Sequence, residues 1–233
     1  MIRSQLRLRP DGGPQKNREA IMIVRKVSEA VIRRLPKYYR QLIALQAAGV
    51  ERISSGKLAQ QMRLNASQVR QDFNCFGGFG QQGYGYNVQH LLEEIRNILA
   101  LDRAYPAIVV GAGRIGTALA NFDGFGRDNI QIQALFDIKP ELVGQTIHGK
   151  PVLHMDALET YIRDNGIRIG IIAARRSTAQ DIADRMQAAG IEGIWNFAPV
   201  DVTVPGIPVE NLHMTDSLLC LCYRIGHQLA DME

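Results

Sequence analysis

The sequence is poor in cysteine and has no long apolar run, and each absence narrows what the chain can be. Its three cysteines among 233 residues form no CxxC pair and no Cys/His pattern of a metal site. We therefore expect free thiols in a reducing compartment and no bound metal. No apolar segment approaches the roughly 20 residues that cross a bilayer, and the N-terminus lacks the apolar core of a secretory signal. These absences predict a cytoplasmic protein without a membrane partner.

Charge divides the chain into two parts of opposite sign. Residues 1–76 contain 15 Lys/Arg and 5 Asp/Glu, a net charge of +10, whereas residues 77–233 contain 12 and 18, a net charge of −6. A basic segment of this size favours a polyanionic partner, with a solvated basic surface as the alternative. The length of the chain favours two domains, each able to bury its own core.

The basic part contains the pattern of a helix-turn-helix. One helix is predicted to begin at Pro36 and to end at Gly49, a second begins at Ser54 or Ser55, and a third begins at Asn65. Only residues 63–64 separate the second helix from the third, which is the short turn that this motif requires. Residues 1–24 lack apolar periodicity and are expected to form a flexible tail; Met22 is an alternative start, so residues 1–21 could be an upstream extension.

The third helix has one apolar and one polar face. Val69, Phe73 and Phe76 recur at helical spacing and should face the core. Amide and guanidinium groups on the opposite face can pair with base edges in the major groove, although an ordinary polar helix surface is the alternative. We expect DNA contacts from this face and from the start of the second helix: Lys57, Ser67, Gln68, Arg70, Gln71 and Asn74.

A glycine-rich segment follows the third helix. Residues 77–87 contain five glycines and three aromatic residues, a composition that predicts a hairpin or wing. Gln81 and Gln82 at its tip could contact phosphates or base edges in the minor groove. A tight hairpin packed by Phe79, Tyr84 and Tyr86 is the alternative, and both can hold.

The acidic part opens with a dinucleotide-binding pattern. After a helix over residues 88–101, an apolar strand over 108–110 runs into GAGRIG and a further helix. The first glycine permits a tight turn, the second lets a pyrophosphate approach the backbone, and the third allows the helix to pack on the strand. The expected cofactor-binding loop is Gly111, Ala112, Gly113, Arg114, Ile115 and Gly116.

Asp137 ends the next predicted strand, over residues 131–136. A carboxylate at this place can accept hydrogen bonds from a ribose hydroxyl and would repel the additional phosphate of NADP, so it favours NAD and NADH. A solvated aspartate in a turn is the alternative.

Strands and helices then alternate, which predicts a doubly wound α/β sheet. The strands are expected over residues 167–173 and 193–197, and the helices over 158–164 and 179–189. The loops after these strands should border the cofactor, which adds Ala174, Asn196 and Phe197 to the predicted site. A mostly apolar last helix, residues 217–229, should pack between subunits or within its own domain.

The order of these predicted segments and several short sequence motifs resemble the Rex family of redox-sensing transcriptional repressors. The motifs are RLPKYYR at 34–40, VRQDFNCFGGFGQQGYGYNV at 69–88, GAGRIG, FDI at 136–138 and NFAPV at 196–200. The resemblance implies a homodimer whose C-terminal helix is swapped between subunits, and NADH binding that releases operator DNA. The expected parts are a tail (1–24), a winged-helix DNA-binding domain (25–104), a Rossmann domain (105–212) and a dimerisation helix (213–233).

The resemblance also implies roles for individual residues. Arg70 and Gln71 match DNA contacts, Arg40 matches a residue of the cofactor-dependent switch, and Met214 matches an apolar residue beside the nicotinamide. Two positions depart from the family pattern: Arg175 stands where a proline is frequent, and His213 where some members have an aspartate that pairs with the Arg40-type residue. Asp216, about one helical turn later, is the alternative partner of Arg40.

An NAD-dependent dehydrogenase would use the same glycine loop, but it also needs a positioned acid or base. The five histidines, His90, His148, His154, His213 and His227, have no recognisable catalytic partner in the sequence. A purely structural dinucleotide- or CoA-binding adaptor would leave the basic part without a purpose. A regulator rather than an enzyme is therefore the prediction.

Overall fold

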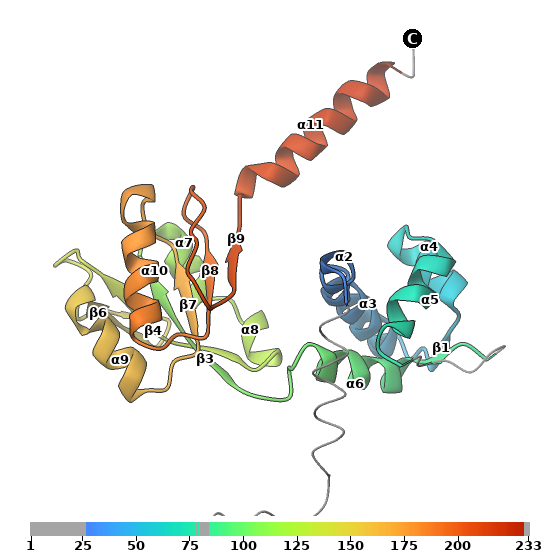
Figure 1. Cartoon of the computed structure of the whole chain (residues 1–233), viewed down its shortest axis with the longest axis horizontal. Coiled ribbons are helices and arrows are strands. Elements are labelled where there is room, and N and C mark those ends of the chain that lie inside the picture. Colours follow the sequence, from blue (N-terminus) through green and yellow to red (C-terminus); the bar gives the residue numbers. More distant parts are fainter. Residues whose placement is uncertain (1–26, 78, 80–83, 231–233) are drawn as a thin grey trace, which may run out of the picture. The chain divides into compact units, whose positions relative to one another are not determined.

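A computed structural model of the chain describes residues 27–77, 79 and 84–230. The predicted tail and the wing-tip residues Gln81 and Gln82 lie outside the described residues. The chain divides into two compact units, residues 1–102 and 103–233 (Figure 1).

The N-terminal unit consists of helices and one small antiparallel pair of strands. Its elements are α2 (Glu29–Ile32), α3 (Leu35–Ala47), β1 (Arg52–Ile53), α4 (Ser55–Met62), α5 (Ala66–Asn74), β2 (Tyr86–Asn87) and α6 (Val88–Ile98). The predicted helix starts are confirmed: Pro36 lies in the first turn of α3, the Ser54 side chain accepts a hydrogen bond from the backbone N–H of Lys57, and that of Asn65 accepts one from Ser67. Because these side chains satisfy amides that a helix leaves unpaired, they fix where α4 and α5 begin.

The turn between α4 and α5 is tight because Arg63 adopts a left-handed conformation with φ of 54°. The next residue, Leu64, donates its backbone N–H to the carbonyl of Ala59. This backbone bond closes α4 just before Asn65 starts α5, which is the geometry of a helix-turn-helix.

Phe73 occupies the centre of the core of this unit. Its ring lies 4.8 Å from that of Tyr38 and 5.1 Å from that of Tyr86, measured between ring centroids. Phe79 also packs on it, at 6.0 Å, whereas Tyr84 is exposed. Val69 and Phe73 are buried as the helical spacing predicts, but the expectation for Phe76 is wrong: α5 ends at Asn74, so Phe76 lies in the following turn and is half-buried.

The C-terminal unit is built on a seven-stranded sheet in the order β5-β6-β4-β3-β7-β8-β9, parallel except for β5. The strands are β3 (Tyr105–Val110), β4 (Ile130–Asp137), β5 (Thr146–Ile147), β6 (Lys150–His154), β7 (Ile169–Ile172), β8 (Gly193–Asn196) and β9 (Val209–Asn211). The strand order reverses at β3, which has β4 on one side and β7 on the other. The predicted doubly wound fold is confirmed; β5, β6 and β9 were not predicted.

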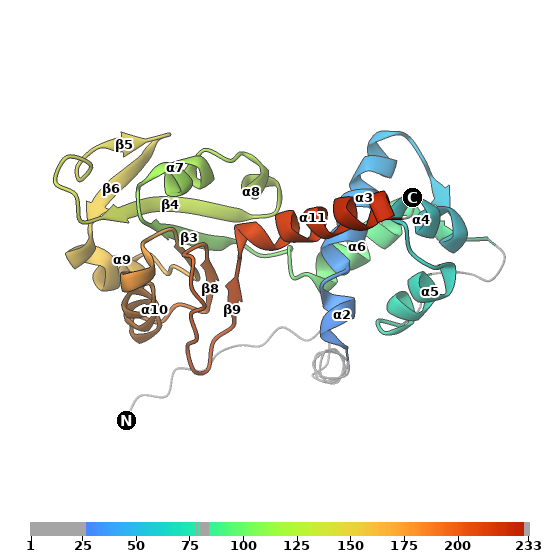
Figure 2. The ribbon, with the colours of Figure 1, turned by 90° about the horizontal axis from the view of Figure 1, so that it is seen from above.

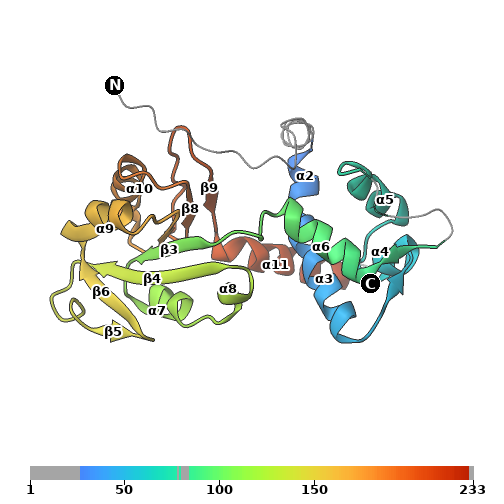
Figure 3. The same cartoon turned by 90° about the horizontal axis from the view of Figure 1, so that it is seen from below.

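Helices cover both faces of this sheet (Figures 2 and 3). One face packs on α9 (Leu158–Asp164) and α10 (Ala179–Ala188), and the other on α7 (Arg114–Ala120) and α8 (Gly124–Arg127). Neighbouring residues of β3 point to opposite faces, so Ile108 and Val110 lie in the first core and Ala107 and Val109 in the second. Two short 3₁₀ turns precede α9 and α10, at Met155–Ala157 and Arg176–Thr178.

The last helix, α11 (Met214–Ala230), leaves its large apolar side chains in water. Met214, Leu218, Leu219, Leu221, Tyr223 and Ile225 are all between 49% and 66% exposed. The structure therefore does not bury α11 within its own unit, which is one of the two alternatives that the sequence leaves open. Among the described residues no helix is long and apolar enough to span a membrane, and the three cysteines are free and exposed.

Two glycines of the N-terminal unit offer a test of the backbone geometry. Gly49, which follows α3, has a φ of +72°, and a Cβ added there would meet no atom within 4 Å. Gly56 lies within α4, and a Cβ added there would meet only the Ser54 hydroxyl, at 3.8 Å. We expect Gly49→Ala to lower the free energy of unfolding by roughly 1–2 kcal/mol, because L-residues are strained in this conformation. Gly56→Ala should raise it by up to about 1 kcal/mol. Urea unfolding of the full chain measures both; equal effects would contradict the difference in backbone conformation.

Candidate functional site

Three glycines shape the loop between β3 and α7. Gly111 has φ of 104°, and a Cβ there would collide with the carbonyl oxygen of Ala173 at the end of β7. A Cβ on Gly116 would collide with the carbonyl oxygen of Gly111. Gly113, the N-cap residue of α7, has open space around the position of a Cβ. The loop is therefore closely packed on the protein side and open where backbone amides at the helix start can meet a ligand.

Asp137 links this loop to the end of β4. One carboxylate oxygen, Oδ2, accepts the backbone N–H of Ala112 at 2.8 Å, and the other, Oδ1, accepts those of Ile138 and Lys139 at 2.8 and 3.0 Å. These three hydrogen bonds hold the half-buried carboxylate at the carboxyl end of the sheet. A carboxylate has about four acceptor positions, so capacity remains for a hydroxyl donor from a ligand.

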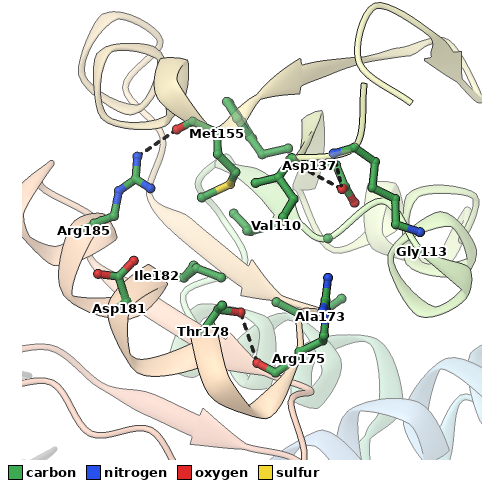
Figure 4. A pocket seen from close by; sticks show the side chains of 15 residues that line it. Val110, Gly113, Asp137, Met155, Ala173, Arg175, Thr178, Asp181, Ile182 and Arg185 are labelled. Atoms are coloured by element: carbon green, nitrogen blue, oxygen red, sulfur yellow. Dashed lines mark hydrogen bonds between the residues drawn. The ribbon is translucent and has the colours of Figure 1, made fainter. Parts of the chain in front are cut away.

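A cavity of about 500 Å³ opens beside the loop, at the carboxyl ends of β3, β4, β6 and β7 (Figure 4). Gly111, Gly113, Asp137 and Ala174 of the predicted site line it. A second, more open cavity of about 550 Å³ shares Gly113 with the first and adds Ala112 and Arg114. Small-molecule sites are usually of this size and usually lie where the strand order of an α/β sheet reverses.

The main cavity also has a wall that the sequence did not predict. Met155 follows β6, and Thr178, Asp181, Ile182 and Arg185 come from α10 and its preceding turn. Arg185 fixes this wall, because it bonds to the Glu159 carboxylate at 2.6 Å and to the carbonyl of Met155 at 2.8 Å. The Arg185 guanidinium holds the pKa of Glu159 below its usual value. No motif marks these residues in the sequence; the unpredicted strand β6 brings Met155 to the cavity.

Other predicted residues lie outside both cavities. Asn196 is fully buried, and its amide nitrogen donates to Val200 and Asn211 while its oxygen accepts the N–H of Ala198. Its hydrogen-bonding groups thus hold the loop after β8. Phe197 packs against Trp195 with ring centroids 4.4 Å apart. Ile115 and Met214 are 39% and 66% exposed, and Gly116 is buried behind the loop.

In the N-terminal unit, α5 presents the polar surface that the helical spacing predicts. Ser67, Arg70, Gln71 and Asn74 are exposed, and so is Lys57 on α4. Arg70 is oriented by a 3.1 Å hydrogen bond from its Nη1 atom to the Ser55 hydroxyl. The surface carries amide, hydroxyl and guanidinium groups, which can pair with base edges or phosphates.

Behind this surface lies a buried carboxylate that the sequence did not reveal. Asp72 of α5 is 0% exposed and accepts hydrogen bonds from Arg34 Nε at 2.6 Å, Arg34 Nη2 and the Tyr38 hydroxyl at 2.8 Å, and Gln68 Nε2 at 2.9 Å. Burial by itself raises the pKa of Asp72, but the bonds from Arg34, Gln68 and Tyr38 outweigh it, so its pKa lies below the usual value. Burial and the Asp72 carboxylate raise the pKa of Tyr38. Asp72 is therefore ionised near neutral pH.

Two family descriptions match the two units. The family "Putative DNA-binding protein N-terminus" matches residues 26–74, and "CoA binding domain" matches residues 102–200. The redox-sensing transcriptional repressor Rex of Clostridioides difficile is 50% identical over 200 residues, which is 85% of this chain and 95% of that protein. That of Clostridium tetani is 47% identical over 205 residues, 88% of this chain and 97% of that protein. The chain belongs to the Rex family.

Solved structures of a Rex-family repressor named RSP share this fold. One crystal structure of RSP matches with a TM-score of 0.82 at 43% identity, over 88% of this chain and 96% of that one. RSP in complex with beta-NAD+ and operator DNA has a TM-score of 0.83 at 45% identity, over 88% of this chain and 95% of that one. RSP in complex with beta-NADH has a TM-score of 0.83 at 42% identity, over 89% of this chain and 98% of that one. The predicted Rex resemblance and the two-part fold are confirmed. The Clostridium and Clostridioides relatives are named as repressors, which agrees with the prediction of a regulator rather than an enzyme.

The glycine loop offers a prediction about stability. We expect Gly116→Ala to lower the free energy of unfolding by about 1–3 kcal/mol, because an added methyl group must displace backbone rather than a flexible side chain. Gly126→Ala is the control, since a Cβ on this glycine of α8 meets nothing within 4 Å. Thermal unfolding of the full chain compares the two, and a melting temperature of Gly116→Ala equal to that of the control would contradict the close approach.

Proposed function

We propose that this protein represses transcription by binding operator DNA through α5 and the wing segment, and that NADH binding in the C-terminal unit releases it from DNA. One observation carries the proposal. A chain of the Rex family combines an exposed polar helix of a helix-turn-helix with a cavity in which Asp137 faces the glycine loop. The relative RSP is described in complex with beta-NAD+ and operator DNA, and with beta-NADH.

In the proposed cofactor site, the pyrophosphate of NAD or NADH lies at the start of α7. Gly113 lets it approach the backbone, Arg114 supplies a positive charge, and Asp137 accepts a ribose hydroxyl. The apolar side of the cavity, which includes Val110 and Ile138, suits the adenine ring. Asn196 contributes through the loop that it holds, and Met214 and Phe197 are assigned to the nicotinamide side of the site.

The proposed DNA-binding surface comprises the polar face of α5 and Lys57, with Gln81 and Gln82 of the wing as further contacts. Lysine and arginine provide the phosphate contacts that position the helix, and the amide side chains provide base contacts. The net charge of +10 over residues 1–76 supports an anionic partner of this kind.

We infer that the working form is a cytoplasmic homodimer in which α11 packs against a second copy and is swapped between the subunits. The exposed apolar side chains of α11 support this assembly, because six large apolar groups on one helix are costly to leave in water. A helix-turn-helix dimer would also present two copies of α5 to two half-sites of an operator.

The switch requires that NADH bind the DNA-incompetent dimer more tightly than the competent one, since equal affinity shifts no equilibrium. We assign Arg40 and Asp216 to the cofactor-dependent switch, as partners across the dimer. Both side chains are exposed. His213 is less suited to this contact because its Nε2 already lies 2.7 Å from the Asp201 carboxylate. A dehydrogenase would also need a positioned acid or base; among the described residues, the lining of the main cavity includes no histidine, and His148 lines the second, more open cavity.

The function is tested by titrating NADH and NAD⁺ against operator binding at fixed salt, because affinity for DNA depends strongly on salt. A duplex that the chain itself selects from a randomised pool serves as the operator. We expect NADH to weaken binding at concentrations at which NAD⁺ does not. Equal affinity with both dinucleotides would contradict redox sensing, and turnover of NADH with small carbonyl compounds without specific DNA binding would favour the dehydrogenase.

The cofactor site is tested by Asp137→Ala. We expect NADH affinity to fall by about 10- to 100-fold, because a hydrogen bond to a charged group is lost, while DNA affinity of the cofactor-free protein stays intact. Asp164→Ala at the exposed end of α9 is the control. Calorimetric titration with NADH measures the change, and an unaltered affinity of Asp137→Ala would overturn the assignment of this carboxylate.

A further inference from the structure

The buried carboxylate of Asp72 reaches the DNA-facing side of α5 through one side chain, Gln68. Gln68 is the third residue of α5 and is half-exposed, at the margin of the exposed face and one turn before Gln71. In a helix-turn-helix, residues at the N-terminal end of the second helix reach base edges. Gln68 thus touches both the interior of the unit and the surface that would meet DNA.

The chemistry of Asp72 decides how the Gln68 amide is oriented. An ionised carboxylate only accepts hydrogen bonds, so it is the amide nitrogen of Gln68 that faces Asp72, at 2.9 Å. One N–H is used by this bond. The carbonyl oxygen and the second N–H of Gln68 remain for a partner, one acceptor and one donor on the same group.

Asp72 is itself held from the other side. Arg34, the N-cap residue of α3, donates from Nε and Nη2 to the two carboxylate oxygens, and the Tyr38 hydroxyl donates to Oδ2. A bidentate guanidinium–carboxylate pair constrains geometry more than a single bond does. The carboxylate therefore cannot rotate freely to follow Gln68, and the amide must adopt the orientation that the carboxylate imposes.

We propose that Asp72 is a positioning residue which fixes the Gln68 amide so that it reads adenine in the operator. The major-groove edge of adenine offers one acceptor, N7, and one donor, the N6 amino group, and it is the base that glutamine pairs with in bidentate fashion. This inference rests on the proposed DNA-binding function. It adds that Gln68 reads adenine and that Asp72 orients Gln68 for this.

The test measures base preference rather than affinity alone. The full chain without NADH is used to select duplexes from a randomised pool, and binding is then compared for duplexes that differ at one base pair, at fixed salt. Gln68→Met keeps the length of the side chain and removes its amide. We expect it to lose a preference for adenine at one position of the site, by about 5- to 150-fold. Gln60→Met is the matched control, an exposed glutamine of α4 outside the proposed DNA-binding surface, and should leave that position unchanged.

The role of Asp72 is separated from stability by two further variants. Asp72→Asn no longer dictates which end of the amide faces it, because asparagine can donate as well as accept; the preference for adenine at the same position should therefore fall. Arg34→Lys loses the bidentate pair but keeps the carboxylate ionised, so the amide nitrogen of Gln68 must still face Asp72; this variant should lower stability and overall affinity while keeping most of the preference. Should Asp72→Asn fail to fold, the double variant Arg34→Met with Asp72→Asn, which leaves no buried charge unpaired, replaces it.

The outcomes separate the role of Asp72 and Gln68 from the repressor function itself. Full adenine preference in Gln68→Met, or in a folded variant that contains Asp72→Asn, would overturn this inference while leaving the repressor function in place. An equal loss of preference in Arg34→Lys would also overturn it, since the network would then act only through stability. Absence of any selected sequence for the unaltered chain would overturn both the inference and the proposed function.

Discussion

The close approach of three backbone segments at the end of β3 is the constraint on which the C-terminal unit depends. Gly111 lies against the carbonyl of Ala173, which follows β7, and Gly116 lies against the carbonyl of Gly111, with no room for a Cβ at either place. This packing brings the start of α7 down to the sheet and directs its backbone amides toward the cavity. Asp137 completes the arrangement, because it holds Ala112 from the neighbouring strand. The position of the glycine loop thus follows from where side chains are absent, and Asp137 supplies the charge beside it.

Both units use a carboxylate to align other groups, but in different surroundings. Asp137 accepts three backbone N–H groups and lies half-buried beside a cavity, so it can still exchange partners with a ligand. Asp72 accepts only side chains and is fully buried, so its charge has to be matched permanently by Arg34. The first arrangement suits a site that is filled and emptied. The second suits a surface whose shape must stay constant.

The sequence revealed the parts of the fold that depend on local chemistry. Proline at the start of α3, capping side chains before α4 and α5, and glycines after β3 each act within a few residues, so the elements could be predicted one by one. The edge strands β5 and β9 were missed because they are two and three residues long and have no apolar alternation of their own. The burial of Asp72 was missed for another reason. Its partner Arg34 is 38 residues away, and only the packing of α5 on α3 brings the charges together.

The same limit applies to the candidate site. The glycine loop and Asp137 belong to the sequence pattern that predicts them. Arg185 and Met155 are brought to the cavity by contacts between distant segments, because Arg185 of α10 bonds to Glu159 of α9 and to the carbonyl of Met155 after β6. Asn196 shows a different limit. This polar residue ends β8, but in the structure its amide bonds to Val200, Asn211 and Ala198. A sequence pattern places a residue at the right edge of the sheet but does not say which way its side chain turns.

The exposed apolar side of α11 has a consequence for how the stability of this protein is to be understood. Any surface that covers Leu218, Leu219 and Tyr223 binds the folded chain and not the unfolded one, so it stabilises the fold by mass action. When the covering surface belongs to another folded molecule, the free energy of unfolding depends on how many such molecules are present. Dilution then acts as a denaturant, and a melting temperature for this protein has a meaning only together with the concentration at which it was measured.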